Sequence, residues 1–171
     1  MLYVVAWPLL AEADDTALRR LRAHYHPDEA DLIGPHFTLV FGAADGDERR
    51  LSDALAGLVA ARPFWFVLDR VVRHDLAPPS RSAYLYAVPA DGSADLVELH
   101  DGLNLPSRSE PFEPHITLGL FQRAADAEQV ARIVERQHLP IHGRVEELAL
   151  LRLDGQELET LATVRLSSRS E

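Results

Sequence analysis

The hydrophobic and polar positions of this chain follow two alternating periods, which predict a succession of strands and helices. Leu2–Leu10 is an almost continuous apolar run rich in Val, Tyr and Trp, as is typical of a buried strand. A helical pattern follows, for which Asp14 or Asp15 is a suitable N-cap, and Pro27 ends it because proline cannot continue a helix. The chain is therefore expected to start with a strand and a helix.

The same kind of pattern continues towards the C-terminus. Apolar runs bounded by proline or glycine predict strands, and apolar positions spaced by three and four residues predict helices. In chain order we expect a strand over His36–Phe41, a helix over Asp45–Ala61, a hairpin of Phe64–Leu76 and Ser82–Val88, a helix over Ala94–Leu103, a loop with Pro106, a strand over His115–Phe121, a helix over Asp126–Gln137, and a last hairpin of Val145–Leu153 and Leu158–Leu166.

The predicted elements fall into two halves with the same order: a strand, a helix, a strand that starts with Pro-His, a second helix and further strands. This order indicates an internal repeat, and the two histidines that open corresponding strands, His36 and His115, lie 79 positions apart. With 171 residues and 47% hydrophobic content, the chain can form one domain. We expect two pseudo-symmetric lobes, approximately 1–80 and 81–171, between which strands can be exchanged.

The composition excludes several classes of chemistry. All 17 basic residues are arginine and there is no cysteine, which rules out lysine adenylates, Schiff-base lysines, thiol nucleophiles and cysteine-based metal sites. Because 27 acidic residues give a net charge of −10, the surface repels an extended nucleic acid, and a nucleic-acid substrate would be a short piece or one end. The apolar N-terminal run lacks the features of a signal peptide or membrane span, so we expect a cytoplasmic protein with no membrane partner.

One five-residue pattern occurs once in each half: Pro35-His36-Phe37-Thr38-Leu39 and Pro114-His115-Ile116-Thr117-Leu118. Four identities at matched positions are hard to obtain by chance. Alternate side chains of a strand face opposite sides, so each histidine should face the same side as its threonine, and the apolar residues should enter the core. If the halves pack about a pseudo-two-fold axis, two imidazoles and two hydroxyl groups meet in one cleft.

Such a set of groups suits chemistry at a phosphodiester. One imidazole takes a proton from an attacking water, and the other gives a proton to the leaving oxygen. An imidazole has an ordinary pKa of about 6.5, so both of its forms exist near neutral pH. The hydroxyl groups of Thr38 and Thr117 would donate hydrogen bonds to the charged phosphate oxygens, and no metal or cofactor is required. The rival interpretation, a metal site at the histidines, lacks a spacing such as His-Glu-x-x-His.

In these residues the sequence resembles the 2H phosphoesterases, a family with two His-x-Thr motifs that includes bacterial 2′-5′ RNA ligases and RNA 2′,3′-cyclic phosphodiesterases. The stretches that match the family pattern are His36-Phe-Thr-Leu-Val-Phe-Gly42 and His115-Ile-Thr-Leu-Gly119. The resemblance implies an α+β fold in which two antiparallel sheets flank a central cleft, with helices on the outside. It also implies hydrolysis of 2′,3′-cyclic phosphates to 2′-phosphates, with His36 as general acid and His115 as general base, and 2′-5′ RNA ligation as the reverse of cleavage.

The chain departs from the family at Leu120, where many members carry an arginine that contacts phosphate. Aromatic side chains are further candidates, because a base can stack on them. The other histidines are interpreted as structural or surface residues, and His26 in particular lies at a predicted helix end, where the helix dipole favours histidine. The candidates for additional phosphate or base contacts are Arg123, Arg81, Arg73, Tyr84 and Phe41.

We therefore predict a monomeric, metal-independent phosphodiesterase that acts on 2′,3′-cyclic phosphates of nucleotides or short RNA ends. Its site residues are His36, Thr38, His115 and Thr117. Two alternatives stay open. The same residues could cleave 2′,5′-linked oligonucleotides or another cyclic phosphate metabolite, or the cleft could bind a nucleotide or RNA end without turnover.

Overall fold

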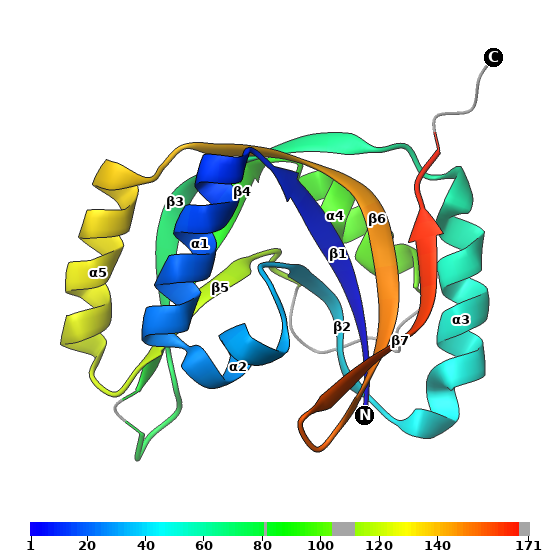
Figure 1. Cartoon of the computed structure of the whole chain (residues 1–171), viewed down its shortest axis with the longest axis horizontal. Coiled ribbons are helices and arrows are strands. Elements are labelled where there is room, and N and C mark those ends of the chain that lie inside the picture. The colour runs from blue at the N-terminus through cyan, green and yellow to red at the C-terminus, as the bar shows by residue number, and fades with distance from the viewer. Residues whose placement is uncertain (81, 104–111, 168–171) are drawn as a thin grey trace.

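Antiparallel strands form one curved sheet in the computed structural model, which describes residues 1–80, 82–103 and 112–167 (Figure 1). The strands are β1 (Leu2–Leu10), β2 (Phe37–Ala43), β3 (Phe64–Asp75), β4 (Ala83–Asp91), β5 (Ile116–Phe121), β6 (Ile141–Asp154) and β7 (Glu157–Arg165). Their order in the sheet is β2-β1-β6-β3-β4-β5, and β7 pairs with the free side of β6 along part of its length.

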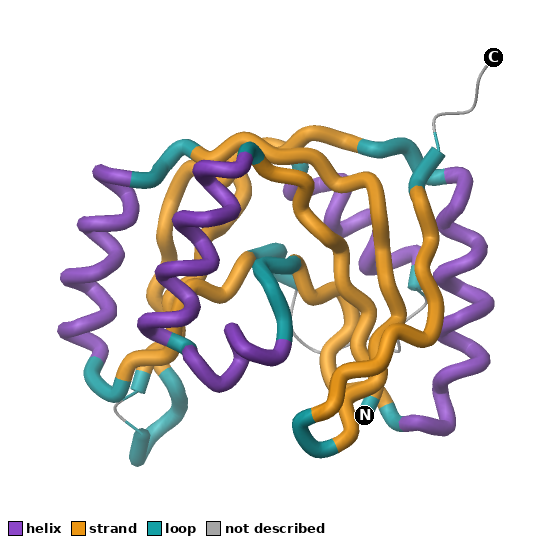
Figure 2. The backbone as a smooth tube through the Cα atoms, in the orientation of Figure 1, coloured by secondary structure: helices purple, strands orange, loops and turns teal. Residues whose placement is uncertain are grey.

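Helices surround this sheet, and the short helix α2 lies near the middle of the molecule, between β5 and β2 in the view shown (Figures 1 and 2). They are α1 (Glu12–Tyr25), α2 (Pro27–Leu32), α3 (Glu48–Gly57), α4 (Ser93–Gly102) and α5 (Ala124–Gln137), with 3-10 turns η1 (Asp45–Asp47) and η2 (Leu58–Ala60) on either side of α3. Helix α5 packs on β3 and β4, whereas α3 packs on β6 and β7. None of the described helices is long and apolar enough to span a membrane.

The strand order is symmetric about the pairing of β3 with β6. This central pairing runs over Phe64–Leu68 and Ile141–Val145, with β4 and β5 following on one side and β1 and β2 on the other. Each side includes one strand from the opposite half of the chain. The α+β class is confirmed, and the two sheets expected from the sequence are the two sides of one continuous sheet, because the β3–β6 hydrogen bonds join them.

The two Pro-His strands, β2 and β5, are the end strands of this order. Figure 1 shows the sheet curling so that both lie near the middle of the molecule. Helix α1 packs on β5 and helix α4 packs on β2, so each motif strand is supported by a helix from the other half of the chain. The fold thus brings together two segments that are far apart in the sequence.

The apolar residues of the motifs enter the core, as the alternating pattern predicts. Phe37 and Ile116 are fully buried, and Leu39 and Leu118 are each 1% exposed. The ring of Phe37 meets that of Phe66 edge to face, with the ring centroids 5.1 Å apart. Burial of large apolar side chains is the main favourable term in folding, so these motif positions anchor the strands that carry the polar ones.

Most predicted elements are present with shifted ends. Helix α1 begins at Glu12, ahead of the predicted cap, and the predicted helix over Asp45–Ala61 is divided into η1, α3 and η2. The polar stretch after α1 forms a further helix, α2, which begins at Pro27 because the fixed φ of proline suits a first helical position. The predicted loop with Pro106 lies outside the described residues.

Gly92, between β4 and α4, has a φ of +79° and is tightly enclosed. A Cβ at this position would lie 2.7 Å from the Cβ of Phe66 and 2.7 Å from the carbonyl oxygen of Trp65. We expect Gly92→Ala to lower the free energy of unfolding by about 1–3 kcal/mol, as measured by urea denaturation. Gly46→Ala is the control, since a Cβ there would meet nothing within 4 Å. Equal losses in the two variants would contradict the expectation.

Candidate active site

The first motif strand contains a β-bulge directly after its threonine. In the pairing of β1 with β2 the register shifts between Thr38 and Val40, which makes Leu39 the extra residue. A bulge places one additional residue in the strand, so the alternation of side chains shifts by one position beyond it. Leu39 and Val40 are therefore both buried, whereas Phe41 returns to the side of Thr38 and lines the same pocket.

The second motif strand has a bulge at the corresponding place. In its pairing with β4, Thr117 lies opposite Tyr86 and Leu120 lies opposite Tyr84, which leaves Leu118 as the extra residue. Residues directly opposite each other on neighbouring strands share a face of the sheet. The threonine and the fifth residue after the histidine therefore face the same side in both motifs.

A side chain from the supporting helix donates a hydrogen bond to the backbone at or directly before the extra residue of each bulge. Nδ1 of His100, in α4, donates a hydrogen bond of 2.7 Å to the carbonyl oxygen of Leu39. The guanidinium group of Arg22, in α1, donates to the carbonyl oxygens of Thr117 at 2.7 Å and Ile33 at 2.9 Å. Ile33 precedes the first motif and Thr117 belongs to the second, so the hydrogen bonds of Arg22 connect the backbones of the two motif regions. The Arg22 side chain is only 1% exposed.

The two motif histidines make matching hydrogen bonds to the backbone. Nδ1 of His36 lies 2.8 Å from the carbonyl oxygen of Gly34, and Nδ1 of His115 lies 2.8 Å from that of Glu113. A carbonyl oxygen only accepts hydrogen bonds, so Nδ1 carries the hydrogen in both rings. Nε2 is then the nitrogen that can take up or release a proton during a reaction, and both imidazoles present the same one.

Burial lowers the pKa of His36 and of His115 below the ordinary histidine value, because removal from water disfavours the charged imidazolium. The backbone hydrogen bonds to Gly34 and Glu113 and the carboxylate of Glu29 act in the opposite direction on these pKa values. The positive charge of Arg22 and, to a smaller extent, a charge on His115 lower the pKa of His36 further. At neutral pH both rings are therefore mainly uncharged.

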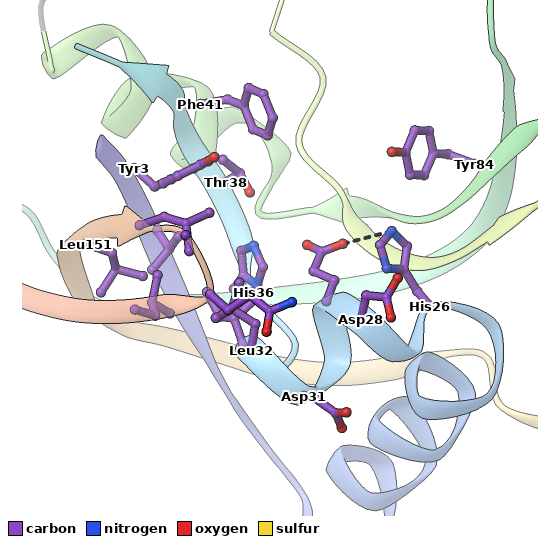
Figure 3. A pocket seen from close by; sticks show the side chains of 17 residues that line it. Tyr3, His26, Asp28, Asp31, Leu32, His36, Thr38, Phe41, Tyr84 and Leu151 are labelled. Carbon is purple, nitrogen blue, oxygen red and sulfur yellow. Dashed lines mark ion pairs between the residues drawn. The ribbon is translucent and has the colours of Figure 1, made fainter. Parts of the chain in front are cut away.

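His36 and Thr38 line a pocket of about 570 Å³ (Figure 3). Tyr3 and Phe41 lie at one side of it, with their rings edge to face and the centroids 5.3 Å apart, and Tyr84 lies at the other side. The volume is in the usual range for a small-molecule site. The remaining lining residues are Val5, His26, Asp28, Glu29, Asp31, Leu32, Ile33, Leu151, Leu153, Gly155, Gln156 and Leu158.

Stacked rings connect this pocket with the second motif histidine. The ring of His26 stacks on Tyr84 with the centroids 6.0 Å apart, Tyr84 stacks on Tyr86 at 5.8 Å, and Tyr86 stacks on His115 at 3.8 Å. Burial is the largest cause that raises the pKa of Tyr86 to about 12. The phenol of Tyr86 therefore keeps its proton at neutral pH and can donate a hydrogen bond beside His115.

Of the four motif residues, His36 and Thr38 line the pocket, whereas His115 and Thr117 are not among its lining residues. Tyr84 and Phe41 line the pocket with His36 and Thr38. Arg73 and Arg123 do not, since the Arg73 side chain forms ion pairs within β3 and with α5, and the Arg123 side chain is 73% exposed at the start of α5. Arg81 lies outside the described residues.

Three polar residues near the motifs were not singled out as functional by the sequence analysis: Arg22, His26 and Glu29. Arg22 follows Leu18 by four residues and so lies on the face of α1 that is expected to be buried. A charged residue on a buried face is the sequence feature that could have identified it. His26 and Glu29 meet only because α2 forms, with Nε2 of His26 3.1 Å from Oε2 of Glu29. In the described ranges, no group of three or more His, Asp or Glu side chains is arranged to hold a metal ion.

A family model matches most of the chain, and several solved structures share its fold. A family model described as the 2′-5′ RNA ligase superfamily matches residues 9–157. TT0787 of Thermus thermophilus has 20% identity, coverage of 99% of both chains and a TM-score of 0.63. E. coli LigT complexed with 3′-AMP has 22% identity, coverage of 98% of both chains and a TM-score of 0.59. Kluyveromyces marxianus Usb1 with uridine monophosphate has 11% identity, coverage of 94% of this chain and 97% of that chain, and a TM-score of 0.56. A comparison with curated proteins gave no match.

Proposed function

This chain belongs to the 2′-5′ RNA ligase superfamily, a family of 2H phosphoesterases, and we propose on this basis that it hydrolyses 2′,3′-cyclic phosphates of nucleotides or RNA ends. The observation that carries the proposal is the matched pair of motif histidines. Each ring donates Nδ1–H to the carbonyl oxygen two residues earlier, and each presents Nε2 for proton transfer. The nucleotides held by LigT and Usb1 support a nucleotide as the substrate class.

The reaction needs one base and one acid. Nε2 of His115 takes a proton from a water molecule as its oxygen attacks phosphorus, and the bond from phosphorus to the 3′ oxygen breaks. Nε2 of His36, protonated at the start, gives its proton to that oxygen and leaves a 2′-phosphate. The hydroxyl groups of Thr38 and Thr117 donate hydrogen bonds to the non-bridging oxygens, where charge increases in the transition state. Proton exchange with solvent restores both rings.

RNA ligation by this site would follow the same path with a different attacking group. A 5′-hydroxyl group takes the place of water, loses its proton to the base and forms a 2′-5′ bond as the 3′ oxygen leaves. No nucleotide cofactor is consumed, which agrees with a chain that has no lysine to carry an adenylate. Because water is present in large excess, we expect hydrolysis to dominate.

The proposal is tested by incubating the protein in EDTA with 2′,3′-cyclic AMP and with an oligonucleotide that ends in a 2′,3′-cyclic phosphate. We expect turnover of both, with the 2′-phosphate as product, as followed by ³¹P NMR. Turnover that is lost in EDTA would contradict a metal-independent reaction. Cleavage of a 2′,5′-linked dinucleotide but of neither cyclic phosphate would point to the alternative substrate. Tight binding of 2′,3′-cyclic AMP without turnover would point to a binding module.

The pH dependence of kcat/KM follows from the environment of the two histidines. The reaction needs one charged and one neutral imidazole, and burial lowers the pKa of both His36 and His115. At pH values above both pKa values the base is ready but the acid has lost its proton, so the rate falls as the pH rises. We expect kcat/KM to be highest below about pH 6.5 and to fall roughly tenfold per pH unit on the alkaline side. A rate that stays level up to pH 8 would contradict this.

A further inference from the structure

The pocket beside His36 is acidic for a site that takes a phosphate. Asp28, Glu29 and Asp31, all on α2, line it. A phosphodiester is an anion and is repelled by carboxylates, so the site needs a compensating positive charge. Within the part of the chain that the structure describes, the basic side chains that line this pocket are those of His36 and His26.

The position of His26 is fixed from several sides. Its backbone N–H donates to the carbonyl oxygen of Arg22 at 2.7 Å, and its own carbonyl oxygen accepts from the N–H of Ala30 at 2.9 Å. Its ring stacks on Tyr84, and Nε2 lies 3.1 Å from Oε2 of Glu29, the contact drawn as a dashed line in Figure 3. An imidazole held in this way loses little conformational freedom when it binds a ligand.

His26 is connected through Tyr84 to an apolar position of the second motif strand. Tyr84, on which its ring stacks, is the cross-strand partner of Leu120. The bulge in β5 turns Leu120 to the same face as Thr117, but a leucine offers no hydrogen-bond donor to a phosphate. The imidazole of His26, which stacks on the partner of Leu120, has a ring N–H that can donate such a hydrogen bond.

We propose that His26 is a phosphate-binding residue of this site, an inference that rests on the proposed function. Its Nε2–H donates a hydrogen bond to a non-bridging oxygen of the substrate phosphate and exchanges the Glu29 carboxylate for it. Glu29 then keeps Arg22 as its neighbour of opposite charge, with Oε1 of Glu29 3.9 Å from Nη2 of Arg22. The substrate group that His26 recognises is the phosphate, not the base.

The test compares the binding of 2′-AMP and of adenosine by calorimetry. We expect His26→Ala and His26→Gln to weaken the binding of 2′-AMP about tenfold or more, because a charge-assisted hydrogen bond is lost. The affinity for adenosine should stay within about twofold in both variants, since it carries no phosphate. His24→Ala is the matched control: His24 is an exposed histidine of the same helix end that does not line the pocket. Equal losses for both ligands, or no loss for either, would overturn the proposal.

A second variant tests whether a cation at the neighbouring strand position can replace His26. Leu120→Arg in the His26→Ala background places a cation on the neighbouring strand position, and we expect it to restore most of the affinity for 2′-AMP. Failure of this rescue in a protein with wild-type thermal stability would count against the proposal. The two proposals can fail separately. If the variants of His36 or His115 lose turnover while His26→Ala binds 2′-AMP as tightly as wild type, the proposed function stands and the inference about His26 is wrong.

Discussion

Replacing His36 or His115 with alanine is expected to lower kcat for 2′,3′-cyclic AMP by about 10²–10⁴-fold. Each variant removes one of the two proton transfers, while the threonines and the pocket stay in place. KM should change much less than kcat, because the lost interaction acts mainly in the transition state. Steady-state kinetics at the pH optimum, with 2′-phosphate measured by chromatography, give both constants.

The double variant sharpens this expectation. Two groups that transfer protons in one step act as a unit, so His36→Ala combined with His115→Ala should be little worse than either single variant. His142→Ala is the control, because His142 is an exposed histidine on β6 outside the pocket, and it should keep wild-type kcat. A large loss in only one of the two motif variants would rule out the paired mechanism and leave a site with a single catalytic histidine.

The motif strands could be predicted because their signals are local. Proline before each histidine marks a strand start, and the alternation around Phe37 and Ile116 assigns the buried face. The bulges could not be predicted, because an extra residue is defined only by pairing with β1 or β4. The sequence therefore indicated which face of the sheet carries His36 and His115. It did not indicate that the fifth residue after each histidine, Phe41 or Leu120, faces the same side.

Features that depend on contacts between segments far apart in the sequence could not be predicted either. The continuous sheet arises from hydrogen bonds between Phe64–Leu68 and Ile141–Val145, segments with no pairing signal of their own. His26 was interpreted as a helix-end residue, and that local assignment is correct for the backbone, since it closes α1. Its place in the pocket depends on α2 and on Tyr84, which is distant in the sequence.

Arg22→Met is expected to lower the free energy of unfolding by about 3–5 kcal/mol. Methionine fills part of the same volume, but it leaves the carbonyl oxygens of Thr117 and Ile33 without their donors and Glu29 without its charged neighbour. Buried acceptors that lose their partners carry the full cost of desolvation. Urea denaturation followed by circular dichroism measures the loss. Arg19→Met is the control, because Arg19 is an exposed residue of the same helix paired with Asp15, and its loss should stay within about 1 kcal/mol.

Arg22→Lys separates the charge of this residue from its shape. Lysine keeps the positive charge near Glu29, but an ammonium group lacks the planar fork with which the guanidinium reaches Thr117 and Ile33 together. We therefore expect a stability between those of wild type and Arg22→Met, with kcat reduced even where the protein is fully folded, because the spacing of the two motifs is no longer held. If Arg22→Lys keeps wild-type kcat, the tie between the motifs does not position the histidines. If Arg22→Met unfolds no more easily than Arg19→Met, the buried guanidinium does not stabilise the fold.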